Sequence, residues 1–559
     1  MKRKCTRGEI QEELDNIANG RSKDPIQEAY HKTLLMIEEA GHSDWAFRVI
    51  SWVFHARRHL SPMELREALA AQTQRDGTRL DLNYAPPDVT TVISYCSGIV
   101  NLSPSTGFIE FVHFTAYQYF ERYHHQHSWI SSGREMSWTC LRYLSFDLFA
   151  PKTDRAFFLD YAVRFWAEHT KPVQNDQKVR QYAMRFLQTP SLTAAADRMF
   201  PIDDPSYITL SLADDLDGPG AAGIHLAARF GLATQVQDLL DVIPVAEING
   251  QDSCGQTPLL LAVKSGCQDV VDLLLEHPNI TPDVPDIHGW SPLSIAARLG
   301  LTRVTKSLLS TGKVDPNLPA WNGWTPTMYA ARSNRLEILE LLLEVNSADP
   351  TRTSPDGDTA LTLAVEMGYA EVVGLLLKRG GVGANPSDLS TKRALELALG
   401  NGNKDVMHTL LQNGFEKALE LLTLPQTAGP QNVSPLLMKD NSALDISHVL
   451  LLAVQKGLTD VVSILLRNNV DINRVDYGGK SMLMVAVENR QKAVVETLLR
   501  AGSCTDTMTK SGDTALFLAV VRGDADIVRI LLKIGGANPN GGCSKIFYPD
   551  ISSILDSSV

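Results

Sequence analysis

Short apolar segments recur at almost constant spacing along the C-terminal three-fifths of the chain. Each segment contains one alanine, and a pair of adjacent leucines follows every one of these alanines twelve residues later. Successive alanines lie 33 to 35 residues apart, except for one spacing of 55. Because both kinds of segment have the pattern of a short amphipathic helix, nine pairs of helices are predicted. The nine alanines are Ala227, Ala262, Ala296, Ala330, Ala364, Ala398, Ala453, Ala486 and Ala519.

The residues around these segments indicate where the helices begin and end. Thr257-Pro258, Ser291-Pro292 and Thr325-Pro326 each combine a capping side chain with a proline at the first helical position. Glycine stands four residues after most of the alanines, where the turn between two helices requires a left-handed backbone. Asn334 and Arg490 replace this glycine in two units, and Arg490 predicts local strain.

A period near 33 residues with paired helices is typical of ankyrin repeats, and the region resembles that family. The resemblance implies a mainly α-helical solenoid whose concave face binds a protein partner. We expect repeats one to six over residues 217–413, an insert over residues 414–446 and repeats seven to nine over residues 447–540. The insert contains several prolines, so it is either a loop or a bend that divides the array into two segments. The tail over residues 541–559 lacks the polar capping repeat that solenoids normally need.

The N-terminal part has a different pattern. Residues 1–43 predict a helical lead-in with apolar side chains on one face. Two helical patterns follow and are separated at Ser61-Pro62. A further helix, a strand, a Ser-Pro-Ser-Thr-Gly turn and a second strand that runs into a helix complete residues 44–127. This order is the layout of a winged helix.

The same part of the chain resembles a known family. Trp52-Val53, Cys96-Ser97-Gly98 and Val112-His113-Phe114-Thr115-Ala116 are similar to the winged-helix module that follows the NACHT nucleotide-binding domain in fungal signal-transducing ATPases. Ankyrin repeats often follow that module in the family. The resemblance covers roughly residues 25–170 and implies that residues 128–216 form the family's helical spacer.

The NACHT ATPase core itself has no counterpart in the sequence. Gly478-Gly479-Lys480-Ser481 resembles the end of a phosphate-binding loop, but Arg474 stands where the first glycine of that loop is required. We therefore expect no nucleotide switch in this chain. The domain either was lost or lies upstream of the sequence.

Charge and cysteine usage narrow the possible partners and compartments. The formal charge at pH 7 is −12, and the part after Leu216 contributes −9 of it, from 28 basic and 37 acidic residues. This charge disfavours nucleic acid and anionic membranes as partners. The seven cysteines include no C-x-x-C pair, which indicates reduced thiols in the cytoplasm or nucleus. No apolar stretch approaches the roughly 20 residues of a membrane span.

Candidate metal and catalytic motifs are incomplete. His55 and His59 have the spacing of zinc ligands on a helix, but Ala56 replaces the glutamate of a metalloprotease motif. The histidines at 124, 125 and 127 are at an expected helix end, where the helix dipole favours them. Asp215-x-Asp217-Gly218 matches only part of a calcium loop. We expect no catalytic residue, cofactor, metal or small-molecule substrate.

These patterns together predict a non-enzymatic ankyrin scaffold that mediates protein–protein interaction in signalling or regulation. One alternative is a transcription co-regulator that acts through a bound transcription factor, and another is an enzyme or a partner of an ATPase in trans. The candidate partner-binding residues are exposed aromatic side chains on the first helix of a repeat or on the extended segment, called the finger, that joins two repeats. Aromatic residues contribute most of the binding energy in many protein interfaces. For two of them, Trp290 and Trp324, packing between the fingers is an equal alternative. The four candidates are Trp290, Trp321, Trp324 and Tyr329.

Overall fold

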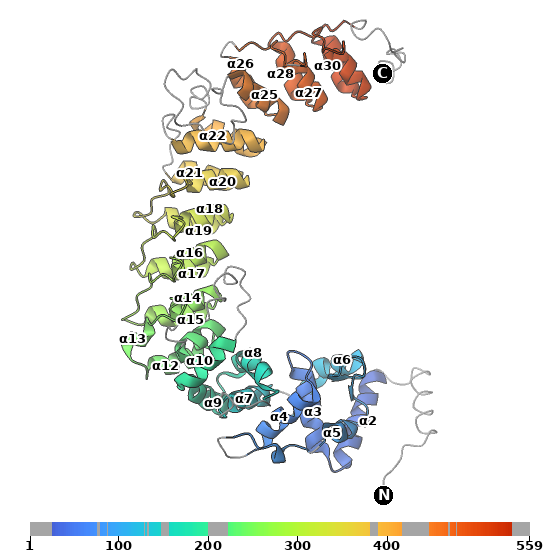
Figure 1. The fold of residues 1–559 in the computed structure, drawn as a ribbon, viewed down its shortest axis with the longest axis vertical. Helices are drawn as coiled ribbons and strands as arrows, with labels where there is room; N and C mark the ends of the chain where they lie inside the picture. The colour runs from blue at the N-terminus through green and yellow to red at the C-terminus, as the bar shows by residue number, and fades with distance from the viewer. Residues whose placement is uncertain are drawn as a thin grey trace. The chain divides into compact units, whose positions relative to one another are not determined.

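The computed structural model is mainly helical and divides into two compact units, Met1–Ile287 and His288–Val559. Figure 1 follows the chain from its first helices to the paired helices of its C-terminal part. Among the described residues, no helix is both long enough and apolar enough to cross a membrane. The structure describes residues 25–74, 79–86, 88–127, 129–130, 133–146, 156–199, 222–380, 389–415, 446–467, 470–476 and 478–538.

The first unit begins with short helices around one β-hairpin. The break predicted at Ser61-Pro62 is confirmed, because Ser61 caps α4 and exchanges hydrogen bonds with Glu64 in a capping box. The two strands pair antiparallel, with Val100 opposite Phe111. The elements are α2 (Pro25–Glu39), α3 (Ser43–His55), α4 (Pro62–Thr73), η1 (Leu82–Tyr84), α5 (Val89–Tyr95), β1 (Val100–Leu102), β2 (Ile109–Phe111), α6 (Phe114–Tyr123) and η2 (His124–Gln126).

Four further α-helices lie between the hairpin region and the first repeat. Their core contains the fully buried rings of Tyr161, Trp166 and Phe186. They are α7 (Arg134–Leu144), α8 (Leu159–Thr170), α9 (Gln177–Leu187) and α10 (Pro190–Met199), with the 3-10 turn η3 (Lys171–Val173) after α8.

These helices pack directly against the first repeat. The ring of Trp166 contacts Phe230 of the repeat, and the Arg180 guanidinium makes a bidentate ion pair with Asp238. The Gln174 side chain accepts a hydrogen bond from the backbone N–H of Thr234 at 3.1 Å. The first repeat is thus covered on its N-terminal side, as stacked repeats require for stability.

The repeats are pairs of short antiparallel helices joined by tight turns (Figure 1). The first unit holds α11 (Gly223–Phe230) with α12 (Ala233–Leu240), the short α13 (Val245–Ile248), and α14 (Pro258–Lys264) with α15 (Gln268–Glu276). The second unit holds α16 (Pro292–Leu299) with α17 (Thr302–Ser310), α18 (Pro326–Arg332) with α19 (Leu336–Leu343), α20 (Ala360–Met367) with α21 (Ala370–Arg379), α22 (Leu389–Asn401) with α23 (Lys404–Leu410) and η4 (Leu411–Phe415), α25 (Ile446–Lys456) with α26 (Thr459–Leu466), α27 (Met482–Glu488) with α28 (Lys492–Arg500), and α29 (Ala515–Val521) with α30 (Ala525–Lys533).

The pattern of alanines and leucines predicted the repeat core correctly. All nine marker alanines are fully buried, and so is the first leucine of every pair. Alanine is needed at these positions because a larger side chain would hold neighbouring helices apart. The turn residues also have the predicted backbone, including Asn334 with φ 55° and Arg490 with φ 56°.

The sixth and seventh repeats contact each other although the chain between them is long. The His408 Nδ1 atom lies 3.0 Å from a carboxylate oxygen of Asp460. A side chain at Gly402 would press on Lys456 of α25. These contacts place the sixth and seventh repeats next to each other, and the choice between a loop and a bend for the insert stays a prediction. Residues 416–445 of the insert and the tail after Asn538 lie outside the described residues.

Candidate protein-binding surface

The predicted anchors Trp290 and Trp324 occupy equivalent positions in two consecutive repeats. Each lies at the end of a finger turn, one residue before the side chain that caps the next helix. In the fourth repeat the backbone N–H of Ala320 donates to the Trp324 carbonyl at 3.0 Å and closes the turn. Both indole rings are partly exposed. The helix caps therefore fix the position of both rings along the array.

Tyr329 corrects one expectation, because it is buried and not exposed. Only 4% of its surface is accessible. Its ring contacts both indoles, with centroids 4.4 Å from Trp290 and 5.4 Å from Trp324. The Tyr329 hydroxyl donates a hydrogen bond to Asn322 Oδ1 at 3.0 Å. Tyr329 thus packs against the two tryptophans, and its buried ring is not available to a partner.

Two arginines complete this cluster and were not among the predicted residues. The Arg298 guanidinium lies over the Trp290 ring at 4.8 Å from its centroid, and Arg332 lies over Trp324 at 5.2 Å. Both distances are typical of cation–π contacts. Each arginine is eight residues after its tryptophan, at the end of the first helix of the repeat. We call Trp290, Arg298, Trp324, Tyr329 and Arg332 the aromatic patch.

The same spacing of eight residues joins other side chains in other repeats. Lys264 donates to Gln256 Oε1 at 2.8 Å, and Lys480 pairs with Glu488 at 2.9 Å. The end of a finger turn and the end of the following helix are therefore neighbours in the repeat fold. The repeat period combined with this offset would have identified Arg298 and Arg332 from the sequence.

Trp321 is the most exposed of the predicted anchors. Its exposed fraction is 76%, and its ring makes an edge contact with the ring of His288, with centroids 5.8 Å apart. Its backbone N–H donates to the His288 carbonyl at 3.2 Å, which joins the fingers of the third and fourth repeats. Gly289 lies directly beneath, where a Cβ atom would come within 2.7 Å of the indole. The indole is thus held at a finger tip and open to solvent.

A wide hollow in the first unit contains the two histidines that have the spacing of zinc ligands. It has a volume of about 900 Å³ and includes His55, His59 and Glu110 in its lining. His55 Nε2 is 2.7 Å from the Ile130 carbonyl oxygen, and burial lowers the pKa of His55. His59 Nδ1 is 3.8 Å from Glu110. Within the described ranges, no three His, Cys, Asp or Glu side chains come together as metal ligands.

The remaining candidate motifs either make hydrogen bonds and ion pairs within the fold or lie outside the described residues. His124 Nδ1 is within hydrogen-bond distance of two carbonyls of its own helix end, and His127 Nε2 is 3.1 Å from the Tyr119 hydroxyl. In the partial phosphate-loop motif, Lys480 is paired with Glu488 and Ser481 caps α27. The Asp215–Gly218 segment lies outside the described residues.

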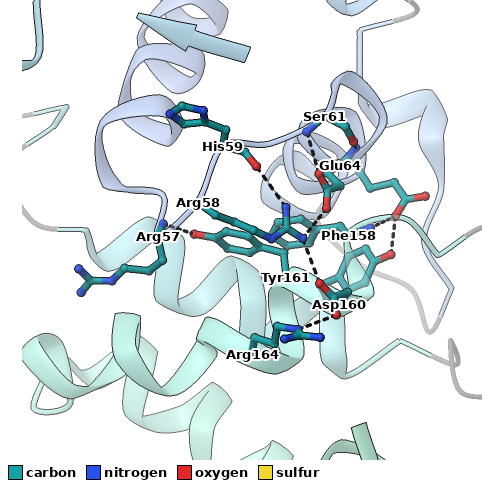
Figure 2. A network of polar contacts seen from close by, with 11 residues as sticks. Arg57, Arg58, His59, Ser61, Glu64, Phe158, Asp160, Tyr161 and Arg164 are labelled. Carbon is teal, nitrogen blue, oxygen red and sulfur yellow. Dashed lines mark hydrogen bonds and ion pairs between the residues drawn. The ribbon is translucent and has the colours of Figure 1, made fainter. Parts of the chain in front are cut away.

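Beside the hollow, Arg58 lies at the centre of a polar network that joins the loop before α4 to α8 (Figure 2). Its guanidinium donates to Glu64 at 2.6 Å and to Asp160 at 3.1 Å, and it lies over the Tyr161 ring. Burial favours the neutral form of Glu64, but the hydrogen bonds from Arg58 and Ser61 and the charge of Arg58 together outweigh it and lower the pKa of this carboxyl. The Tyr161 hydroxyl also accepts from the backbone N–H of Arg57. All these groups satisfy one another, so the network is structural.

Comparison with known proteins agrees with the repeat geometry. The family described as "Ankyrin repeats (3 copies)" matches residues 224–320, 282–354, 328–420, 433–509 and 450–543, which together cover more than half of the chain. The chain belongs to the ankyrin-repeat family. This family supports binding of protein partners as the general role of the repeats. It is typically non-enzymatic.

Two curated ankyrin proteins show a short local similarity. Rabankyrin-5 of Mus musculus and rabankyrin-5 of Homo sapiens are each 40% identical to this chain over 67 residues. The match covers 12% of this ankyrin chain and 6% of either relative. This chain therefore spans only a small part of the length of either relative. The winged-helix and NACHT resemblance of residues 25–170 stays a prediction.

Proposed function

We propose that the chain is a non-enzymatic scaffold of signalling or regulation in the cytoplasm or nucleus, and that the concave face of its ankyrin repeats binds a protein partner. The observation that carries the proposal is the Trp321 indole, which is 76% exposed in the same finger turn as the partly exposed Trp324, one repeat after the partly exposed Trp290. Exposed aromatic rings on a rigid support are the residues that contribute most to protein interfaces. The order of helices and hairpin in the first unit supports a winged-helix module that acts with the repeats.

The N-terminal helices have a supporting role in this proposal. They cover the first repeat through Trp166 and Arg180, so a version cut before the repeats would expose the Phe230 ring to water. The binding test therefore needs the full chain with single positions changed.

Site-specific photocrosslinking tests the proposal. A photoreactive amino acid replaces Trp321 in one version, exposed Arg303 on α17 in a second, and Phe114 of the first unit in a third. We expect a discrete protein adduct in cells from position 321 and none from position 303. An adduct from position 114 alone would assign partner binding to the first unit and contradict the proposal.

The non-enzymatic part has a separate test. The purified full chain is incubated with ATP or GTP and magnesium, and phosphate release is measured. We expect release at the rate of the buffer. Hydrolysis that co-purifies with the chain and is abolished by a single substitution would contradict the proposal.

A further inference from the structure

The ends of the finger turns and the first helices of the third and fourth repeats are positively charged, which is unusual for this acidic chain. Residues 288–300 and 321–335, which hold the ends of the finger turns and the first helices, contain three arginines and no aspartate or glutamate. The chain as a whole has a formal charge of −12. Two of these arginines, Arg298 and Arg332, belong to the aromatic patch. A local cationic surface on an acidic protein selects an anionic partner by charge complementarity.

The two cation–π contacts hold each guanidinium against its indole. A guanidinium that stacks face-on over an indole keeps the N–H groups of its edge available for further hydrogen bonds. Among the described residues, Arg298 has no carboxylate partner. Arg332 has one, Glu366, whose carboxylate lies 3.6 Å away in an ion pair between two side chains that are each about half exposed, and such exposed pairs contribute little. Both arginines are therefore placed to receive a carboxylate in the bidentate geometry that arginine favours.

We propose that the aromatic patch binds an extended acidic segment of a partner protein. Carboxylates of that segment pair with Arg298 and Arg332, and an apolar side chain of the segment rests on the exposed ring of Trp321. This inference rests on the proposed function and names the chemistry of the partner. The regular spacing of the two tryptophan–arginine pairs, 34 residues apart in consecutive repeats, matches a segment that runs along the array.

Single-stranded nucleic acid also combines negative charge with flat apolar groups, but the surroundings disfavour it. In the fifth repeat, Asp358 and Glu366 occupy the positions equivalent to Trp324 and Arg332. A long polyanion would meet these carboxylates beyond the patch. The rings of Trp290 and Trp324 are also covered in part by arginine and by Tyr329, so of the three tryptophans only Trp321 offers an open ring to a stacked base. A peptide with a few acidic residues avoids both problems.

A peptide selection on the full chain tests the inference. Random short peptides displayed on phage are selected against the wild-type protein, and the enriched peptides are synthesised and measured by fluorescence anisotropy. We expect acidic peptides with at least one apolar residue. The double variant Arg298→Gln/Arg332→Gln should bind them on the order of tenfold or more weakly, because charged hydrogen bonds are lost. Arg303→Gln, which removes one positive charge from helix α17, should bind as wild type.

A variant that is expected to bind more tightly provides a second test, because a misfolded protein would not gain affinity. Glu366→Gln removes the carboxylate near Arg332, and we expect it to tighten binding of the same peptides. Equal thermal unfolding of all variants verifies that the fold is kept.

Several outcomes would overturn the inference. Enriched peptides that are neutral or basic, or that bind the double variant equally well, would overturn it while leaving the protein-binding function intact. A thymidine oligonucleotide that binds the patch as tightly as the selected peptides would assign the surface to nucleic acid. If no peptide is enriched and position 321 gives no crosslink, both the inference and the proposed function fail.

Discussion

The indole ring of Trp166 meets the ring of Phe230 edge-on, with centroids 5.5 Å apart. Trp166 belongs to α8 and Phe230 ends the first helix of the first repeat, so this contact joins the N-terminal helices to the repeat array. Trp166 also packs against Phe186 of α9 and is fully buried. The helices before the repeats therefore form one apolar core with the first repeat.

Replacing Trp166 should destabilise the first unit strongly. The Trp166→Leu variant leaves a cavity between two aromatic rings, and we expect a loss of roughly 3 kcal/mol in the free energy of unfolding. Chemical denaturation measures it. Trp321→Leu is the matched control, because that ring is exposed and its loss should cost less than about 0.5 kcal/mol. Equal effects of the two substitutions would contradict the packing described.

Gly223, at the start of α11, should not tolerate alanine. A Cβ atom there would overlap the backbone carbonyl of Leu187, which cannot move as a flexible side chain could. We expect Gly223→Ala to cost at least about 2 kcal/mol. Gly400 in α22 has open space around it, and Gly400→Ala should be neutral or stabilising by up to about 1 kcal/mol. Thermal unfolding of both variants provides the comparison, and a harmless Gly223→Ala would show that α9 and α11 are not in contact.

His169 should make the first unit sensitive to mild acid. Burial lowers the pKa of His169 from 6.5 to about 3, and its Nε2 is 2.8 Å from the Tyr161 hydroxyl. The pKa of His169 is lower in the folded protein than in the unfolded chain. The first unit therefore has its full stability above pH 6.5 and loses stability as the pH falls. We expect a loss of about 2 kcal/mol between pH 7 and pH 5. Denaturation at both pH values measures it, and His169→Gln should reduce the difference. The same difference in wild type and variant would exclude His169 as its source.

Replacing Arg490 with glycine should stabilise the second unit. Its backbone has φ 56°, a conformation that costs an L-residue about 1–2 kcal/mol. The Arg490→Gly variant removes this strain but also the hydrogen bond from Arg490 to the Arg522 carbonyl. We expect a net gain of roughly 0.5–1 kcal/mol in the stability of the second unit. A clear loss in thermal unfolding would mean that the hydrogen bond matters more than the strain.

The repeat fold was predictable from the sequence because its core depends on a period. One buried alanine and one buried leucine recur in every repeat, so a single chain carries nine independent copies of the same signal. The candidate site was less predictable, because its geometry depends on neighbours. Tyr329 is buried with Trp324 of its own repeat and Trp290 of the preceding repeat against its ring, and the contact with Trp290 cannot be inferred from its own repeat alone. The contact between Trp166 and Phe230 joins two segments that share no periodic pattern.

Hydrogen–deuterium exchange of the full chain, with and without the protein captured at position 321, tests the central claim most directly. If the repeats bind the partner, amide exchange should slow in the finger turns that end at Trp290 and Trp324 and in the first helices α16 and α18. The helices α3 to α8 should exchange at an unchanged rate. Slower exchange confined to α3–α8, with the repeats unaffected, would contradict the account.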